Sequence, residues 1–253
     1  MGDSPAPLLR VENIHVRLGG QLILREVSFD LAPHTTLSVI GASGCGKTTL
    51  LRAIAGLIGA ERGRVLLGNE NVESLAPNRR RMVYLNQEPL LFPHLNLFDN
   101  VAFGLRLRRF DDSAIRERVG ELLSQLELEG LELRRPDALS GGQRQRAAFG
   151  RALAVDPALL LLDEPFSNLD TDTRKSMQDV FKRLAHERGT TAVFVTHDLK
   201  EAMRVGDRFA LIRAGRVYTY RDRDEFCADP ASGVDREAAF WRDFSKTGSG
   251  EPG

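Results

Sequence analysis

A glycine-rich segment between residues 41 and 48 has the composition and spacing of a phosphate-binding loop. It fits the pattern G-x-x-x-x-G-K-[ST], in which glycines let backbone N–H groups turn inward around phosphate oxygens. Lys47 would reach the β- and γ-phosphates of a nucleotide, and the Thr48 hydroxyl would hold Mg²⁺. The candidate nucleotide-binding residues are Gly41, Ala42, Ser43, Gly44, Cys45, Gly46, Lys47, Thr48 and Thr49. The alternative is a chance glycine turn, which a preceding strand and a following helix disfavour. Cys45 occupies a variable position of the pattern, where an inert side chain is favoured over a redox role.

Two adjacent carboxylates follow a short apolar run further along the chain. Residues 159–162 are four leucines, and Asp163 and Glu164 come directly after them. A buried strand of this kind would bring Asp163 to the carboxyl edge of a parallel sheet, where it could orient Mg²⁺. A solvated loop entry would explain the same pair of residues. The glycine loop upstream favours the functional interpretation.

A third segment, Ser140-Gly141-Gly142-Gln143, predicts an anion-binding helix start. Ser140 can cap a helix whose free N–H groups point outward, and the glycines allow another group to approach closely. An ordinary capped helix would explain the serine, but not the two glycines followed by Gln143.

The hydrophobic pattern predicts an alternation of strands and helices around these segments. Strands are expected at residues 8–18, 26–30, 36–40, 65–67, 82–85, 159–162, 191–195, 208–212 and 216–218. Helices are expected at residues 48–57, 113–128, 141–155 and around 177–184, with Asp112 or Ser113 as the cap of the second. The alternation indicates an α/β fold with a mainly parallel sheet covered by helices, and the first two strands are expected to be antiparallel.

Composition excludes several classes of protein. The 253 residues contain 35 basic and 35 acidic side chains, so no polyanion-binding surface is indicated. Two cysteines make no disulfide framework, which fits a reducing compartment. The first seven residues lack the pattern of a secretory signal. No apolar run approaches the roughly 20 residues that span a bilayer.

In this order and spacing, the three segments resemble the ATP-binding cassette (ABC) ATPases, and the resemblance extends from about Leu8 to about Tyr220. It implies a phosphate-loop NTPase with an N-terminal antiparallel β part and an inserted helical subdomain. The expected single ABC ATPase domain covers residues 8–220. Residues 8–88 and 156–220 would form the RecA-like core and residues 89–155 the helical subdomain with the signature motif. Residues 221–253 would be a short tail, too short for an independent regulatory domain.

The resemblance also implies roles for individual residues. Glu164 would be the general base, Lys47 and His197 would contact the γ-phosphate, and Gln87 would sense Mg²⁺ and water. The implied metal-holding residues are Thr48, Gln87 and Asp163. Ser140, Gly141, Gly142 and Gln143 would contact the ATP bound by a second subunit, so that a head-to-tail homodimer holds two ATP molecules. The segment from Ser167 to Asp170 would connect the two sites, although Asp170 could equally cap the next helix.

Residues 86–95, with the continuation Phe92-Pro93-His94, look especially similar to bacterial importer ATPases. Such importers carry iron(III), oxyanions, polyamines, thiamine or sugars. The resemblance implies two membrane-spanning permease subunits that dock near residues 87–94, an indirect solute-binding protein, no nucleic acid, and a place at the cytoplasmic face of the plasma membrane. An exposed Leu91-Phe92 pair would suit docking of a short permease helix. Alternatively, the pair packs inside the helical subdomain.

Two other functional classes are disfavoured. A soluble ABC ATPase acting on DNA or ribosomes would carry a long coiled coil or a second cassette, and neither is found here. A regulator that binds ATP without turnover would not need both Glu164 and His197.

One position departs from the family pattern. Family members generally stack an aromatic residue on adenine, and here that position is Leu18. Weak selectivity for adenine is therefore expected, unless Arg17 stacks on the base instead. Beyond residue 220, residues 235–244 are expected to form one helix.

Overall fold

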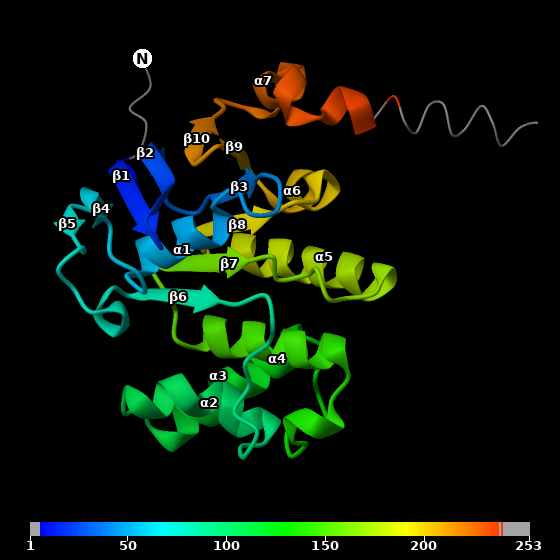
Figure 1. Ribbon diagram of the computed structural model, residues 1–253. Helices are drawn as coiled ribbons and strands as arrows, with labels where there is room; N and C mark the ends of the chain where they lie inside the picture. The colour runs from blue at the N-terminus through cyan, green and yellow to red at the C-terminus, as the bar shows by residue number, and fades with distance from the viewer. Residues whose placement is uncertain (1–5, 238, 240–253) are drawn as a thin grey trace, which may run out of the picture.

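The computed structural model describes residues 6–237 and residue 239, which form two sheets and the helices packed on them (Figure 1). The strands are β1 (Leu9–Leu18), β2 (Gln21–Leu31), β3 (Thr36–Ile40), β4 (Arg62–Leu67), β5 (Glu70–Asn71), β6 (Met82–Leu85), β7 (Leu159–Asp163), β8 (Ala192–Thr196), β9 (Arg208–Arg213) and β10 (Arg216–Thr219). The helices are α1 (Lys47–Ala55), α2 (Leu97–Leu107), α3 (Asp112–Gln125), α4 (Gly141–Ala154), α5 (Thr171–Glu187), α6 (Leu199–Val205) and α7 (Arg223–Ala228). Three short 3-10 turns are η1 (Pro77–Arg79), η2 (Pro136–Ala138) and η3 (Pro230–Ser232).

The larger sheet has the strand order β10-β9-β3-β8-β7-β6, in which only β10 is antiparallel to its neighbour. The smaller sheet, β2-β1-β4-β5, is antiparallel throughout. The predicted α/β fold with an antiparallel β part is confirmed. Because parallel strands end at the same edge, the segments that follow β3, β7 and β8 meet there.

The central strands are apolar on both faces because each face packs on a different core. Leu159 and Leu161 of β7 pack with α1 and with strands of the smaller sheet. Leu160 and Leu162 pack with the helices on the other side. This two-sided burial explains the unbroken run of leucines.

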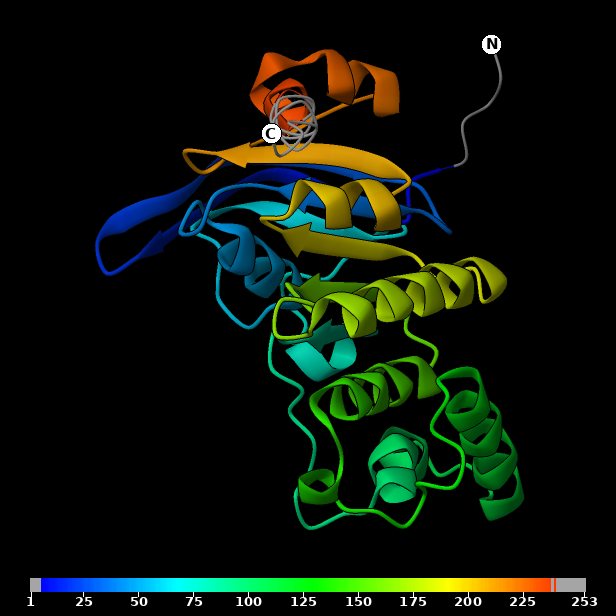
Figure 2. The same ribbon diagram turned by 90° about the vertical axis from the view of Figure 1, so that its right-hand side faces the viewer.

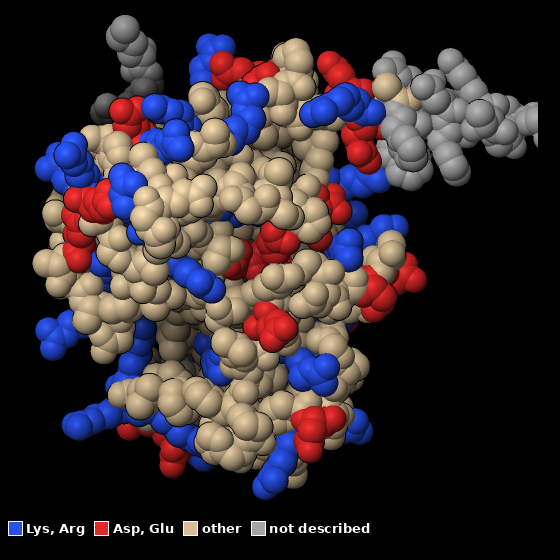
Figure 3. Space-filling model, viewed as in Figure 1, with Lys and Arg blue, Asp and Glu red and all other residues tan. Residues whose placement is uncertain are grey.

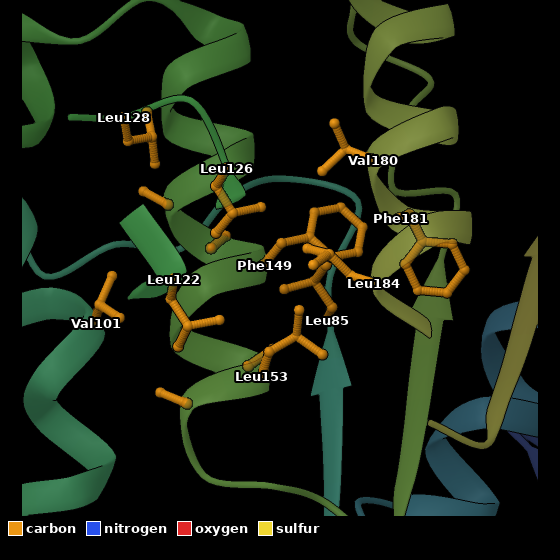
Figure 4. Close-up of a cluster of buried hydrophobic side chains, with 14 of the residues drawn as sticks. Leu85, Val101, Leu122, Leu126, Leu128, Phe149, Leu153, Val180, Phe181 and Leu184 are labelled. Carbon is orange, nitrogen blue, oxygen red and sulfur yellow. The ribbon is translucent and has the colours of Figure 1, made fainter. Parts of the chain in front are cut away.

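A helical part made of α2, α3 and α4 lies beyond β6, as both ribbon views show (Figures 1 and 2). Its core is continuous with that of α5 and the sheet, and Figure 4 shows side chains from α2, α3, α4, α5 and β6 meeting there. Phe149 of α4 packs on Phe166 and Phe181, with ring centroids 5.8 and 5.6 Å apart. These aromatic contacts join the helical part to the rest of the molecule.

Three sequence expectations need correction or restriction. β2 begins at Gln21 rather than at residue 26. The N-cap position of α3 is held by Asp111, without a side-chain cap hydrogen bond, and Asp112 is the first helical residue. Of the helix expected at residues 235–244, residues 235–237 and 239 are helical, and the others lie outside the described residues.

Among the described residues, no helix is both long and apolar enough to cross a bilayer. On the face drawn in Figure 3, basic and acidic side chains are interspersed rather than gathered by sign.

Candidate nucleotide-binding site

The loop between β3 and α1 owes its shape to glycines. Gly44 and Gly46 have φ angles of 78° and 110°, which side chains with a Cβ atom rarely adopt. A Cβ atom at Gly41 would lie 2.7 Å from the carbonyl oxygen of Ile212, so no side chain fits there. The loop follows β3 and leads into α1, so the predicted order of strand, glycine loop and helix that the phosphate-loop pattern requires is present.

Lys47 begins α1 and is buried, with 5% of its surface exposed. Its Nζ donates to the carbonyl oxygens of Gly41 (2.8 Å) and Ala42 (3.1 Å) and lies 3.3 Å from a carboxylate oxygen of Glu164. A buried ammonium needs such partners because burial without them is costly. The same charge is available to a phosphate that enters the loop.

Thr48 and Asp163 meet across the site. The Thr48 hydroxyl donates to Oδ1 of Asp163 at 3.0 Å. Tyr84 of β6, which the sequence analysis did not single out, donates its hydroxyl to Oδ2 of the same carboxylate at 2.6 Å. Burial first, and then the neighbouring Asp163, raise the pKa of Tyr84 to about 12, so the phenol stays protonated at neutral pH.

Glu164 directly follows β7 with a φ of 45°, an uncommon conformation for a residue other than glycine. Its backbone N–H donates to the carbonyl oxygen of Val195 in β8, at 3.0 Å. Oε2 of its carboxylate lies 2.8 Å from Nδ1 of His197, which follows β8. The structure thus brings Lys47, Glu164 and His197 together, and the strained backbone at Glu164 aims its side chain between the other two.

Gln87 reaches the same region from the loop after β6. Its amide donates to the hydroxyl of Ser167 at 3.1 Å, and that hydroxyl donates to the carbonyl oxygen of Glu164 at 2.9 Å. In this conformation Gln87 therefore contacts the segment after Glu164 rather than Thr48 or Asp163. Asp170 caps α5 by accepting from the backbone N–H of Thr173, as the structural alternative for that residue predicted.

Arg174 and Glu201 are further residues that the sequence reasoning missed. Arg174 of α5 donates to the carbonyl oxygen of Leu169, and its Nε lies 3.7 Å from Glu201 of α6. The buried Glu201 accepts from the hydroxyl of Thr196, the residue before His197. The contact between Arg174 and Glu201 joins two helices that are far apart in the chain, so no local pattern could have indicated it.

An open hollow of about 250 Å³ lies over the glycine loop. Its lining consists of Leu18, Ile23, Ser43, Gly44, Gly46, Lys47, Thr48, Thr49 and Glu164. Arg17 is engaged elsewhere, with Glu61 (3.0 Å) and the carbonyl oxygen of Gly20 (2.8 Å). The apolar side chains at the edge of the hollow are therefore those of Leu18 and Ile23.

Cys45 is half-buried beside the glycine loop. Burial raises the pKa of its thiol, which disfavours the reactive thiolate at neutral pH. Its position supports the interpretation of an inert side chain.

Ser140 caps α4 as predicted. Its hydroxyl accepts from the backbone N–H of Gln143 at 3.2 Å, and the side chain of Gln143 accepts from the backbone N–H of Ser140 at 2.9 Å. Gly142 packs against Thr173, where a Cβ atom would lie 2.5 Å from a methyl group, while Gly141 is exposed. Among the described residues, no hydrogen bond or ion pair joins Ser140, Gly141, Gly142 or Gln143 to the glycine loop.

The structure distinguishes between the exposed and the packed alternative for the Leu91-Phe92 pair in the loop after Gln87. Leu91 and Phe92 are partly buried, and Leu91 packs on the core of the helical part. The Phe92 ring lies 4.5 Å from that of Phe103, and the guanidinium of Arg151 lies 5.0 Å from its centroid. The structure favours the alternative in which the pair packs in the helical part, because both side chains are partly buried there. Leu90 is the exposed residue, at 58%.

A glycine loop between a parallel strand and a helix, with a strand-end carboxylate facing its threonine, defines a phosphate-loop nucleotide-binding protein of α/β fold. Residues 24–167 match the family described as ABC transporter. The chain is 42% identical over 234 residues to a molybdate/tungstate import ATP-binding protein from Pyrococcus horikoshii, a match that covers 92% of this chain and 68% of that protein. It is 43% identical over 213 residues to a sulfate/thiosulfate import ATP-binding protein from Xanthomonas campestris, which covers 83% of this chain and 62% of that protein.

Among solved structures, the fold is similar to a dimeric ATP-binding cassette in a post-hydrolysis state bound to ADP and Pi. The TM-score is 0.75 at 30% identity, over 85% of this chain and 99% of that one. The chain belongs to the ABC transporter family. It spans about two thirds of the length of the two curated relatives.

Proposed function

We propose that this chain is the ATP-hydrolysing motor subunit of an ABC importer. One observation carries the proposal: Lys47, Glu164 and His197 converge beside the glycine loop, next to the contact between Thr48 and Asp163. The reaction is in-line attack of water on the γ-phosphate of ATP. The names of the two relatives, both import ATP-binding proteins, support the transport assignment.

The residues of this site would fit a nucleotide with Mg²⁺. Thr48 and Asp163 offer a hydroxyl and carboxylate oxygens, the ligands that Mg²⁺ prefers, within 3.0 Å of each other. When bound, Mg²⁺ neutralises charge on the phosphate oxygens. Gln87 would have to leave Ser167 to join these ligands. The backbone N–H groups around Gly44 and Gly46 hold the phosphates.

The contacts of Lys47 suggest an order of events. Lys47 Nζ exchanges Glu164 for a γ-phosphate oxygen, which frees the Glu164 carboxylate to accept a proton from the attacking water. His197, which lies against the other carboxylate oxygen, orients Glu164 and hydrogen-bonds the phosphate.

The helix start at Ser140 would complete the site of a second copy in a head-to-tail homodimer. Closure of this dimer would act on two permease subunits docked near residues 87–94, where Leu90 is exposed. The solute is bound by those subunits and by a solute-binding protein, and this chain lies at the cytoplasmic face of the plasma membrane. The interspersed charges do not favour the alternative of a nucleic-acid-binding ABC ATPase.

The proposal is tested by the substitution Glu164→Gln, which keeps the size of the side chain and removes its basicity. We expect ATP turnover to fall by about 100-fold or more, since general-base catalysis contributes roughly 10²–10⁴-fold. Mg-ATP binding, measured by calorimetry, should remain. Glu70→Gln, in the exposed β5, is the matched control and should hydrolyse ATP at the wild-type rate. Turnover retained by Glu164→Gln would refute the assignment of the base.

A further inference from the structure

Both oxygens of the Asp163 carboxylate are held by hydroxyl groups. Thr48 donates to Oδ1 at 3.0 Å, and Tyr84 donates to Oδ2 at 2.6 Å. Asp163 is only 6% exposed, so solvent has little access to replace either donor. The orientation of this carboxylate therefore depends on two protein side chains, of which only Thr48 belongs to the glycine loop.

The sheet fixes the position of the Tyr84 hydroxyl. β6 runs parallel to β7, with Tyr84 opposite Leu161, and the phenol extends to the end of β7 where Asp163 lies. The ring is partly buried and packs against the core beneath α1. A donor mounted on a buried strand is held more firmly than one on a loop, which suits a residue that must orient another.

A cation lies near the phenol. Arg52, in the last turn of α1, lies close enough to the Tyr84 hydroxyl to act on its pKa, which this cation lowers. The proton of the Tyr84 hydroxyl is donated to Asp163. Arginine pairs strongly with carboxylates when nothing separates them. The phenol is thus near a guanidinium and is bonded to the carboxylate that would hold Mg²⁺.

We propose that Tyr84 is a positioning residue for magnesium, which keeps Asp163 turned toward Thr48 and keeps Arg52 from pairing with it. The inference rests on the proposed function to the extent that Thr48 and Asp163 hold the Mg²⁺ that accompanies the nucleotide. Without the hydroxyl, Asp163 can rotate away from Thr48, and Arg52 competes with Mg²⁺ for its charge. Hydrogen-bond partners of metal ligands commonly affect metal affinity by about 10- to 100-fold.

The test measures ADP binding by calorimetry, once with excess Mg²⁺ and once with EDTA. The ratio of the two dissociation constants gives the enhancement by Mg²⁺. In Tyr84→Phe this enhancement should fall by about 10-fold or more, whereas ADP binding in EDTA should match wild type. The double variant Tyr84→Phe with Arg52→Met should recover part of the enhancement, because the competing cation is gone.

The chain offers a matched control. Tyr220 donates its hydroxyl to Asp229 at 2.5 Å, in a Tyr–Asp pair outside the nucleotide site. Tyr220→Phe removes the same kind of hydrogen bond and should leave the enhancement unchanged. An unchanged enhancement in Tyr84→Phe, or an equal loss of binding in EDTA, would overturn the inference. A wild-type chain that binds ADP equally with and without Mg²⁺ would instead refute the metal site of the proposed function.

A second measurement needs no change at Tyr84 and is independent of how well that variant folds. The sequence has three tyrosines and one tryptophan, so few side chains contribute to the ultraviolet difference spectrum at wavelengths beyond the adenine band. Adding Mg²⁺ to the ADP complex should shift tyrosine absorbance, because a cation held by Asp163 changes the electrostatic environment of the Tyr84 hydroxyl bonded to it. The shift should persist in Tyr220→Phe. Absence of any shift in the wild-type chain would contradict a link between Tyr84 and the metal.

Discussion

Leu18 stands at the edge of the nucleotide hollow, 44% exposed, where the family resemblance leads one to expect an aromatic ring. Since Arg17 is bound to Glu61 and Gly20, no cation–π contact replaces the ring in this conformation. A missing ring contact costs about 0.5–1.5 kcal/mol. We expect GTP to compete well with ATP in binding measurements, and Leu18→Tyr to tighten ATP binding by about 2- to 10-fold.

The control for this prediction is Leu133→Tyr, which places a ring on another exposed leucine, away from the hollow. It should leave the affinity for both nucleotides unchanged. A strong preference of the wild-type chain for ATP would contradict the prediction.

At the residue scale, the sequence indicated the side chains that lie within compact motifs. Lys47, Thr48 and Asp163 are identifiable because their spacing from glycines or from a strand end is itself the signal. Tyr84 is not, because its role arises from the register of β6 against β7, and a tyrosine in a strand is usually only a packing residue. Most residues of the candidate site could be predicted from the sequence. The residues that could not be predicted lie on other strands and helices and contact the motif residues.

At the scale of elements, α2 shows why one helix was not predicted separately. It is amphipathic, but it begins within a proline-containing loop, and its cap is Asn96, which accepts from the backbone N–H of Asp99. Asn100 is fully buried in this helix, an unusual place for an amide. The structure accounts for it through four hydrogen bonds to the preceding loop.

Those hydrogen bonds lead to a prediction about Asn100. Its side-chain oxygen accepts from the backbone N–H of Phe92, and its amide donates to the carbonyl oxygens of Phe92, Leu95 and Asn96. Asn100→Asp would keep the acceptor but place a carboxylate against three carbonyl oxygens. We expect the free energy of unfolding, from urea denaturation, to fall by more than about 2 kcal/mol, because buried polar groups lose their partners.

Asn71→Ala is the matched control, since the Asn71 side chain accepts a single hydrogen bond, from the backbone N–H of Glu73, on the surface. Its cost should stay within about 0.5–1 kcal/mol. Equal stability losses in the two variants would show that the hydrogen bonds of Asn100 do not stabilise the loop before α2.

At the scale of the whole molecule, the larger sheet separates two cores, one shared with α1 and the smaller sheet and one shared with the helical part. The alternation of apolar runs predicted this layering, because strands buried on both faces need helices on each side. The attachment of the helical part to the rest of the molecule depends on contacts such as Phe149 with Phe166, which no local pattern reveals. The arrangement leaves the start of α4 separate from the glycine loop of the same chain.

This separation leads to the last prediction, which concerns assembly. The capping box at Ser140 uses the side chains of Ser140 and Gln143, while Gly141 stays exposed and open to a phosphate from outside the chain. The Glu164→Gln chain with Mg-ATP should therefore sediment as a dimer. Adding Ser140→Ala should weaken the dimer by at least about 10-fold, since a hydrogen bond to a charged group is worth roughly 1.5–3 kcal/mol.

Loss of the cap alone lowers stability by about 1 kcal/mol, so Asp222→Ala, which removes the cap of α7, separates the two effects. That control should leave the dimer intact. A chain that remains monomeric with Mg-ATP, both alone and with the proposed permease subunits, would exclude a site shared between two copies.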